Sequence, residues 1–335
     1  MIKVGIVGSG FGLYGLLPAF NSTPNCKVIS ICGSESERML DYCMSIGLKK
    51  IYRSWQEMLD KEDLEAIALA VTPNAQYEIA KAAIEKGLHI FAEKPLTATL
   101  EQAQELLQLA SQKKIVHAID FLFPEIEEWK KVKKLLDKKV CGNLKQINLK
   151  WDFLSYDIKN QKSSWKTNTA EGGGALSFYF SHSLYYLEYF AGKIFDLKSR
   201  LSYASKSPNG GDVGVDLQLE FENGVLCNAH INCNSSDVNK HQLEFICDEG
   251  TINLENENNI TSNFIIKIKK NGEEKQLPLP HEQNIEGEDE RVRIVRKLAT
   301  RFINSIIQEK QFIPSFNEGV RVQELIEKIR NQNVT

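Results

Sequence analysis

The sequence lacks the features that mark exported, membrane-bound or nucleic-acid-binding proteins. Its longest apolar runs, such as Ala66 to Val71, are far shorter than the roughly 20 residues that a membrane helix needs. The first residues lead directly into glycines, without the apolar stretch and cleavage site of a signal peptide. A net charge of -3, with both signs interspersed, provides no basic stripe. We therefore expect a soluble, cytoplasmic protein with neither a membrane nor a nucleic-acid partner.

Clustered cysteines and histidines are also lacking. The 7 cysteines form no C-x-x-C pair and fall mostly in apolar stretches, as reduced thiols that pack as small hydrophobes do. The 6 histidines are scattered, without the spacing of metal ligands. We predict no metal site.

With 335 residues, the chain is long enough for two domains. Over residues 1–122, short apolar runs alternate with helical patterns, which predicts a doubly wound, parallel α/β sheet of the Rossmann type. The expected strands are 3–7, 27–32, 66–71, 89–92 and 115–119, and the expected helices are 13–21, 36–45, 75–86 and 100–113. Thr99 is the expected N-cap of the last helix, with Gln102 as its capping-box partner.

Residues 123–335 have a different character, and we predict a second α/β domain with a mainly antiparallel sheet that is covered on one face. Period-two alternation and turn signals indicate strands. The strands are expected at 144–153, 213–221, 225–232, 241–247 and 263–269, and helices at 124–139, 176–189, 289–308 and 317–331. The Asn/Glu-rich segment 253–263 is expected to be a surface loop.

A glycine-rich turn follows the first strand. Gly8, Gly10 and Gly12 surround Phe11, and such glycines let backbone N–H groups approach a pyrophosphate at the start of the next helix. The third glycine of the usual fingerprint would fall at Leu13, so the motif alone is moderate support for dinucleotide binding.

The end of the second strand should select between NAD and NADP. An acidic residue that binds the ribose hydroxyls is absent from its tip. Ser34 and Arg38 could bind a 2′-phosphate, although Glu35 and Glu37 oppose that reading. We expect NAD or NADP as cofactor, with a slight preference for NADP.

Two further motifs, Thr72-Pro73-Asn74 and Glu93-Lys94-Pro95, each close an expected parallel strand. Ligands bind at the carboxyl ends of the strands in doubly wound sheets, so both tripeptides are candidate cofactor-binding motifs. Asp120 ends the fifth expected strand and is a candidate substrate-binding residue.

Together with Trp165-Lys166, Gly172-Gly173-Gly174 and His182, these motifs make nearly the whole chain resemble the Gfo/Idh/MocA family. Glu93-Lys94-Pro95 is the most specific marker. The resemblance implies a Rossmann domain (1–122), and a domain for substrate binding and oligomerisation (123–335) whose open antiparallel sheet mediates dimers or tetramers. The implied activity is NAD(P)-dependent oxidation or reduction of sugars, polyols or related compounds.

Within that resemblance, Lys94 and His182 are the candidate catalytic residues, because an ammonium can polarise a substrate hydroxyl and an imidazole can exchange its proton. If 176–189 is helical, Tyr186 shares a face with His182 and can also contact substrate. Trp165 and Lys166 are candidate neighbours of the cofactor. The triple glycine would permit close approach of the backbone to cofactor or substrate.

One position departs from the family pattern. Polyol dehydrogenases of the family carry an aspartate four residues before the histidine, and here that residue is Phe178. Tyr186, Tyr179 or Asp120 could replace the carboxylate; otherwise the substrate is unusual or the enzyme is a reductase with a simpler proton relay.

Two alternatives to a hydride-transferring oxidoreductase stay open. One is a glycosidase of the same type, which oxidises its sugar transiently and has no net turnover of NAD. The other is a metabolite sensor without catalysis, which the loss of the aspartate favours modestly and the presence of Lys94 and His182 opposes.

Overall fold

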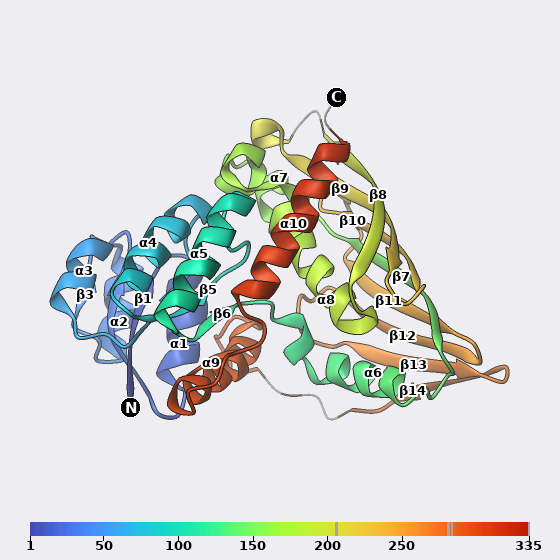
Figure 1. The fold of residues 1–335 in the computed structure, drawn as a ribbon, viewed down its shortest axis with the longest axis horizontal. Helices are drawn as coiled ribbons and strands as arrows, with labels where there is room; N and C mark the ends of the chain where they lie inside the picture. The colour runs from blue at the N-terminus through green and yellow to red at the C-terminus, as the bar shows by residue number, and fades with distance from the viewer. Residues whose placement is uncertain (205–206, 280–281, 283, 334–335) are drawn as a thin grey trace. The chain divides into compact units, whose positions relative to one another are not determined.

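The computed structural model describes residues 1–204, 207–279, 282 and 284–333 (Figure 1). The chain forms two compact units. Unit 1 comprises Met1–Leu122 and Asn284–Gln323, and unit 2 comprises Phe123–Gln283 and Glu324–Thr335. The boundary between the two units after Leu122 coincides with the change in sequence character at residue 123. Residues 284–323, which we expected within the second domain, pack with unit 1 instead, because α9 lies against α1 (bounds below).

Unit 1 contains a parallel sheet of six strands in the order β3-β2-β1-β4-β5-β6. Their bounds are β1 (Ile2–Val7), β2 (Cys26–Cys32), β3 (Ile51–Tyr52), β4 (Ala66–Leu69), β5 (His89–Ala92) and β6 (His117–Ile119). The chain enters the sheet at β1 and crosses to the other half between β3 and β4, as in a doubly wound fold. The Rossmann prediction is confirmed.

Most helices of unit 1 connect these strands, and α9 and the first half of α10 come from the end of the chain. The helices are η1 (Gly12–Leu16), α1 (Leu17–Asn21), α2 (Glu37–Ser45), α3 (Trp55–Lys61), α4 (Pro73–Glu85), α5 (Leu100–Lys113), α9 (Val292–Ile307) and the first half of α10 (Phe316–Gln332). Thr99 caps α5 by accepting a hydrogen bond from the N–H of Gln102. The reciprocal half of the expected capping box is missing, because the side-chain oxygen of Gln102 has no hydrogen-bond partner among the described residues.

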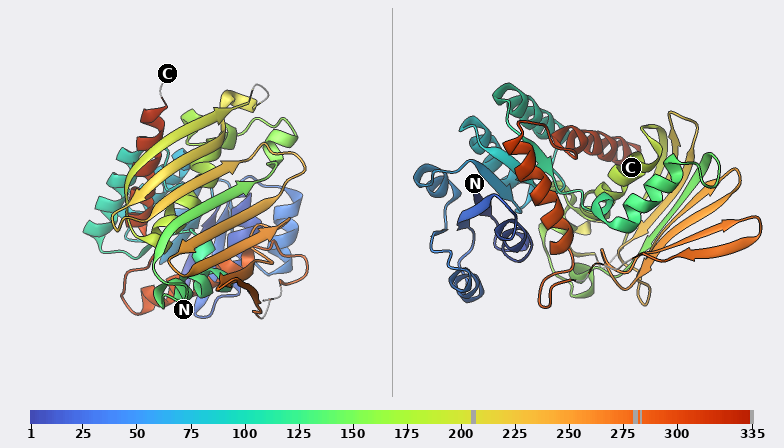
Figure 2. Two further views of the ribbon diagram at one scale, coloured as in Figure 1. Left: turned by 90° about the vertical axis from the view of Figure 1, so that its right-hand side faces the viewer. Right: turned by 90° about the horizontal axis from the view of Figure 1, so that it is seen from below.

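Unit 2 contains an eight-stranded sheet in the order β14-β13-β12-β11-β7-β10-β9-β8. The strands are β7 (Leu144–Asp152), β8 (Ile194–Tyr203), β9 (Asp212–Phe221), β10 (Leu226–Asn232), β11 (Lys240–Cys247), β12 (Gly250–Glu257), β13 (Ile265–Lys270) and β14 (Glu273–Leu277). Within the described part of this sheet, only the pairing of β7 with β10 is parallel. The left view of Figure 2 shows the strands side by side.

Buried and exposed residues alternate along β9, β10 and β11, so one face of this sheet is covered, as predicted. The helical segments of unit 2 are η2 (Phe123–Glu125), α6 (Glu127–Asp137), α7 (Tyr156–Lys159), η3 (Trp165–Thr167), η4 (Thr169–Glu171), η5 (Leu176–Phe180), α8 (Ser181–Ala191), η6 (Pro208–Gly210) and the end of α10. The expected helix 176–189 is therefore a π-helical turn followed by an α-helix.

The prediction of a surface loop at 253–263 is wrong over its first residues. Gly250–Glu257 is strand β12, which pairs with β11 on one side and β13 on the other. Ile252, Leu254 and the polar Asn256 are buried on its inner face, and the alternating residues Asn253 and Glu255 are partly exposed. The strands β8 and β14 were also not predicted.

No helix in the described part of the chain is long and apolar enough to cross a membrane.

Candidate active site

The glycine-rich turn after β1 is shaped by contacts that exclude side chains on one side and leave space on the other. A Cβ at Gly8, whose φ is +132°, would lie 2.2 Å from the carbonyl oxygen of Ala70. A Cβ at Gly12 would lie 3.2 Å from the carbonyl oxygen of Val7. At Gly10, no described atom lies within 4 Å of the Cβ position. The turn thus has the open, backbone-lined surface that fits a dinucleotide pyrophosphate.

Phe11 is fixed by two contacts that the sequence did not reveal. A Cβ at Gly15 would lie 2.3 Å from the Phe11 ring, so this ring packs directly on the glycine backbone. The guanidinium carbon of Arg291 lies 4.4 Å from the ring centroid of Phe11. Asp289 holds the Arg291 guanidinium through two hydrogen bonds of 2.8 Å. Arg291 lies far along the sequence, within the segment that returns to unit 1, and no motif marks it.

At the end of β2, Ser34 and Arg38 are exposed. The Arg38 guanidinium lies over the ring of Tyr14, 5.8 Å from its centroid, and Tyr14 belongs to η1 just after the glycine-rich turn. Glu35, whose charge would repel a phosphate, is paired with Arg53 through a hydrogen bond of 2.6 Å. A carboxylate that counted against the binding of NADP is therefore neutralised.

Thr72 is the N-cap residue of α4, Pro73 occupies its first turn and Asn74 follows. The side chain of Gln76, two residues later, is buried and donates hydrogen bonds to three carbonyl oxygens. The acceptors are those of Glu93 (2.6 Å), Pro95 (3.2 Å) and Leu96 (2.9 Å). Gln76 thereby fixes the backbone on both sides of Lys94. Sequence reasoning missed Gln76, because nothing in the sequence links it to residues 17 to 20 positions away.

Lys94 and Asp120 follow neighbouring strands of the sheet. Ala92 of β5 pairs with Ile119 of β6, and the N–H of Asp120 donates a hydrogen bond of 2.8 Å to the carbonyl oxygen of Ala92. Glu93 and Lys94 are partly buried, and Asp120 is fully buried. The structure thus brings together, at one sheet edge, Lys94, Glu93 and Asp120.

The triple glycine in unit 2 has a different function from the one we expected. A Cβ at Gly173 would lie 1.9 Å from the carbonyl oxygen of Trp165, and one at Gly174 would lie 2.1 Å from Oδ1 of Asp212. The close approach that these glycines permit is by the protein's own loop and by Asp212. Oδ2 of Asp212 also accepts a hydrogen bond of 2.7 Å from the N–H of Leu176.

Arg330 completes this arrangement from the end of α10. Its guanidinium donates hydrogen bonds of 2.8 Å to the Gly173 carbonyl oxygen and to the Ser177 hydroxyl, and it lies 3.6 Å from Oδ1 of Asp212. Asp212 and Arg330 together hold the loop from which η5 and α8 begin.

Phe178 packs in an aromatic group. Its ring lies edge-on to that of Trp165, with centroids 5.3 Å apart, and the Nζ atom of Lys166 lies 4.9 Å from the Phe178 centroid. Tyr179 packs between Phe178 and Phe153, with centroid distances of 4.6 and 4.7 Å. An apolar wall therefore occupies the position of the missing aspartate.

His182 and Tyr186 both lie on α8 and both are buried. The His182 ring is edge-on to Phe123 at 5.2 Å. The hydroxyl of Tyr186 forms hydrogen bonds with Ser183 (2.7 Å) and with Nε2 of His241 (3.0 Å), and burial raises its pKa. Tyr186 has no exposed surface to offer a substrate, and its contacts support the helix instead.

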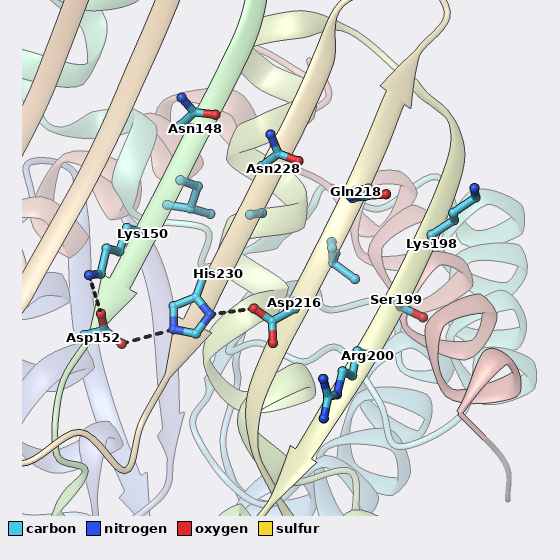
Figure 3. A pocket seen from close by; sticks show the side chains of 13 residues that line it. Asn148, Lys150, Asp152, Lys198, Ser199, Arg200, Asp216, Gln218, Asn228 and His230 are labelled. Carbon is cyan, nitrogen blue, oxygen red and sulfur yellow. Dashed lines mark hydrogen bonds and ion pairs between the residues drawn. The ribbon is translucent and has the colours of Figure 1, made fainter.

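A cavity of about 770 Å³ lies over the outer face of the eight-stranded sheet, and none of the candidate residues lines it (Figure 3). At its centre, His230 lies between Asp216 (2.6 Å) and Asp152 (3.2 Å). No group of three or more His, Cys, Asp or Glu side chains that could hold a metal occurs among the residues described.

A Rossmann sheet with an open glycine turn, and with a lysine and carboxyl groups at adjacent strand ends, defines a nicotinamide-dependent oxidoreductase. Two family models match the chain. The model described as the oxidoreductase family with an NAD-binding Rossmann fold matches residues 2–121, and the GFO/IDH/MocA C-terminal domain matches residues 129–253. The chain belongs to the GFO/IDH/MocA family of oxidoreductases, which confirms the resemblance and the NAD-binding class of its first domain.

Similar proteins are oxidoreductases too. An oxidoreductase from Synechocystis sp. is 28% identical over 97% of this chain and 92% of its own length. A dTDP-3,4-didehydro-2,6-dideoxy-alpha-D-glucose 3-reductase from Saccharopolyspora spinosa is 22% identical over 91% of this chain and 87% of its own.

Solved structures show the same fold at lower identity. Levoglucosan dehydrogenase, in complex with NADH and levoglucosan, has a TM-score of 0.85 at 20% identity, covering 99% of this chain and 96% of its own. A 3-ketoreductase from Actinomadura kijaniata, in complex with NADP and TDP-benzene, has a TM-score of 0.82 at 20% identity, covering 99% and 97%.

Proposed function

We propose that this oxidoreductase transfers a hydride between a nicotinamide cofactor and a carbon–oxygen centre of a sugar or a related polyhydroxylated molecule. Lys94 is the proposed acid–base group at the reacting oxygen, and His182 is the proposed second proton-exchanging group. Lys94 is supported by its place after β5, where the side chain of Gln76 donates hydrogen bonds to backbone carbonyl groups on both sides of Lys94. A fixed backbone is what a proton-transferring group needs, since its efficiency depends on positioning.

The cofactor, when bound, supplies or accepts the hydride, and the residues of this chain handle the proton. When the substrate is oxidised, the amine of Lys94 accepts the hydroxyl proton as the carbonyl forms. When the substrate is reduced, the ammonium returns a proton to the oxygen. The turn at Gly8, Gly10 and Gly12 is the proposed pyrophosphate site, with Trp165 and Lys166 as further proposed cofactor contacts.

For the substrate, the wall formed by Phe178 and Trp165 favours a ring with a C–H face over an open, fully hydroxylated chain, because aromatic rings pack well against apolar faces. The names of the similar proteins, levoglucosan dehydrogenase and dTDP-sugar 3-reductase, support a cyclic sugar. Whether the sugar carries a nucleotide is decided by the substrate screen below.

For the cofactor, we propose a preference for NADP. The ion pair of Glu35 with Arg53 and the placement of Arg38 over Tyr14 support it. We predict that Ser34→Asp raises the ratio of NAD to NADP activity by about tenfold or more, because a carboxylate accepts ribose hydroxyls and repels a 2′-phosphate. Ser45→Asp, a substitution at the end of α2, is the control. An unchanged ratio in Ser34→Asp would mean that another residue selects the cofactor.

We also propose that the outer face of the eight-stranded sheet binds a second copy of the chain. The middle of this face is polar and carries both signs of charge, with Lys150, Asp152 and Asp216 around His230 and with Lys198 and Arg200 on β8 (Figure 3). Two such faces related by a twofold axis can pair opposite charges. A monomeric mass by light scattering at micromolar concentration contradicts this proposal.

The experiment that tests the proposed function is a screen of cyclic sugars, keto sugars, polyols and nucleotide-linked sugars with NAD, NADP and their reduced forms. We expect a change of nicotinamide absorbance with at least one sugar. Product formation without net cofactor turnover would indicate the glycosidase alternative. Binding of cofactor and sugar without any reaction would indicate a sensor.

A further inference from the structure

We propose that Asp120 is the group that holds and returns the proton of Lys94, so that a carboxyl group takes part in the proton relay although position 178 is a phenylalanine. The inference rests on the proposed function, because every hydride transfer to or from an oxygen-bearing carbon requires a proton to move as well. Of the three residues that could replace a carboxylate at position 178, namely Tyr186, Tyr179 and Asp120, this proposal selects Asp120.

The topology places Asp120 beside Lys94. The paired residues Ala92 and Ile119 end neighbouring parallel strands, and the next residue in each chain segment carries a carboxyl group, Glu93 after β5 and Asp120 after β6. The backbone hydrogen bond from Asp120 to Ala92 locks this register. Lys94 is the residue that follows Glu93, so the amine and the Asp120 carboxyl belong to one cluster at the sheet edge.

The Asp120 carboxyl group is fully buried, and it shares a side-chain hydrogen bond with Glu93. Two carboxyl groups bond to each other only when one of them carries a proton, so this pair holds a proton at the carboxyl ends of the strands. The charged groups that face Asp120 are Glu93, Lys94 and Arg291. Burial, the negative charge of Glu93 and the hydrogen bond with Glu93 raise the pKa of Asp120 well above its usual range, while Lys94 and Arg291 oppose the rise.

The other two candidates have different partners. Tyr186 is fully buried, and its hydroxyl is bonded to Ser183 and His241. Tyr179 packs its ring against Phe178 and Phe153 and belongs to the aromatic wall. Asp120 is the one carboxyl group of the three residues, and it lies in the same unit as Lys94.

The proton balance of a reduction shows what Asp120 contributes. The Lys94 ammonium gives its proton to the substrate oxygen as the hydride reaches the carbon, which leaves a neutral amine. The protonated Asp120 carboxyl then transfers its proton to that amine, so that the O–H bond of Asp120 breaks and an N–H bond of Lys94 forms. The resulting carboxylate faces two cations, Lys94 and Arg291, and solvent reprotonates it before the next turnover. In an oxidation, each transfer runs in reverse.

The direct test is independent of any substrate. Protein labelled with ¹³C at the aspartate side-chain carboxyl carbons is titrated by NMR, and Asp120→Asn is compared with Asp212→Asn, which removes a buried aspartate of unit 2 whose pKa is also raised. We expect the aspartate signal with the highest pKa to vanish in Asp120→Asn and to persist in Asp212→Asn. Loss of that signal only in Asp212→Asn would overturn the proposal, and so would titration of every aspartate in its ordinary range.

Kinetics then separate a proton-handling role from a structural one. We expect Asp120→Asn to lower kcat by about 10–100-fold, the range seen when a group that supports a reacting residue is removed. We also expect a changed pH profile of kcat and little change in KM. A lower kcat with a pH profile of unaltered shape would contradict the proposal. Because the NMR result does not need activity, it stays informative even if the substrate screen fails.

Discussion

The two units each bury an aspartate, and the two aspartates have opposite surroundings. In unit 2, Asp212 accepts a hydrogen bond from the N–H of Leu176 and faces the guanidinium of Arg330. In unit 1, Asp120 shares a hydrogen bond with the carboxyl group of Glu93 and lies beside Lys94. A buried carboxyl group held by an N–H group and a guanidinium fixes a loop, whereas one that shares a proton with a second carboxyl group is available for proton transfer. Substitutions near Asp212 should therefore affect stability, and those near Asp120 should affect proton transfer.

The largest effect on stability is expected for Arg330→Met. The change leaves Asp212 buried without a cation and removes the hydrogen bonds to Gly173 and Ser177. Removing one partner of a buried ion pair costs about 3–5 kcal/mol. Urea unfolding measures the loss, and the control is Lys328→Met, two residues earlier on the same helix, which breaks an exposed ion pair with Asp196. If both variants lose equally little free energy of unfolding, the ion pair of Asp212 with Arg330 does not hold the loop.

Gly174→Ala tests the same loop from the other side. The new Cβ would lie 2.1 Å from Asp212 Oδ1, in addition to the strain of a φ of +91°. The matched control is Gly224→Ala, where φ is +80° and no described atom lies within 4 Å of the Cβ. We expect the control to lose about 1–2 kcal/mol of the free energy of unfolding, from backbone strain alone. Gly174→Ala should lose clearly more. Equal losses would show that the contact with Asp212 is unimportant.

The smallest effect concerns the pH dependence of stability. The pKa of Asp120 is raised in the folded state, so the folded protein keeps a proton that the unfolded chain releases near pH 3.9. This contribution to stability is present below about pH 3.9 and is lost as the pH rises through the raised pKa. Relative to Asp120→Asn, the wild type should lose about 1.4 kcal/mol per pH unit in that window. Parallel stability curves would mean that Asp120 titrates normally.

The two units also differ in how many of their strands and helices could be predicted from the sequence. In unit 1, hydrophobic runs and caps such as Thr99 identified five of the six strands, because a parallel sheet buried on both faces leaves a continuous apolar signal. The two-residue strand β3 and the short helix α3 that follows it were not predicted. In unit 2, the end of β12 was predicted to be a loop, because its inner face carries only two apolar residues, Ile252 and Leu254, followed by the buried but polar Asn256. The edge strand β14 is charged and exposed, as edge strands often are, so its composition resembled a turn.

For the site, motifs identified Lys94, Asp120 and the glycine turn, but not the residues that support them. Gln76 and Arg291 act through contacts between segments distant in sequence, which a single sequence does not encode as a local pattern. The triple glycine does permit close approach to its backbone, as predicted, but the group that lies against Gly174 is the Asp212 side chain and not a ligand.

The most direct test of the account is the rate of hydride transfer in Lys94→Met, followed by nicotinamide absorbance with whichever sugar the wild type uses. We predict that kcat falls by about 10²–10⁴-fold, the usual range for an acid–base group, with cofactor affinity and urea stability unchanged. Lys49→Met, at an exposed lysine of the same unit, should keep full activity. Near-normal turnover in Lys94→Met would contradict the central claim that the carboxyl end of β5 is where the chemistry occurs.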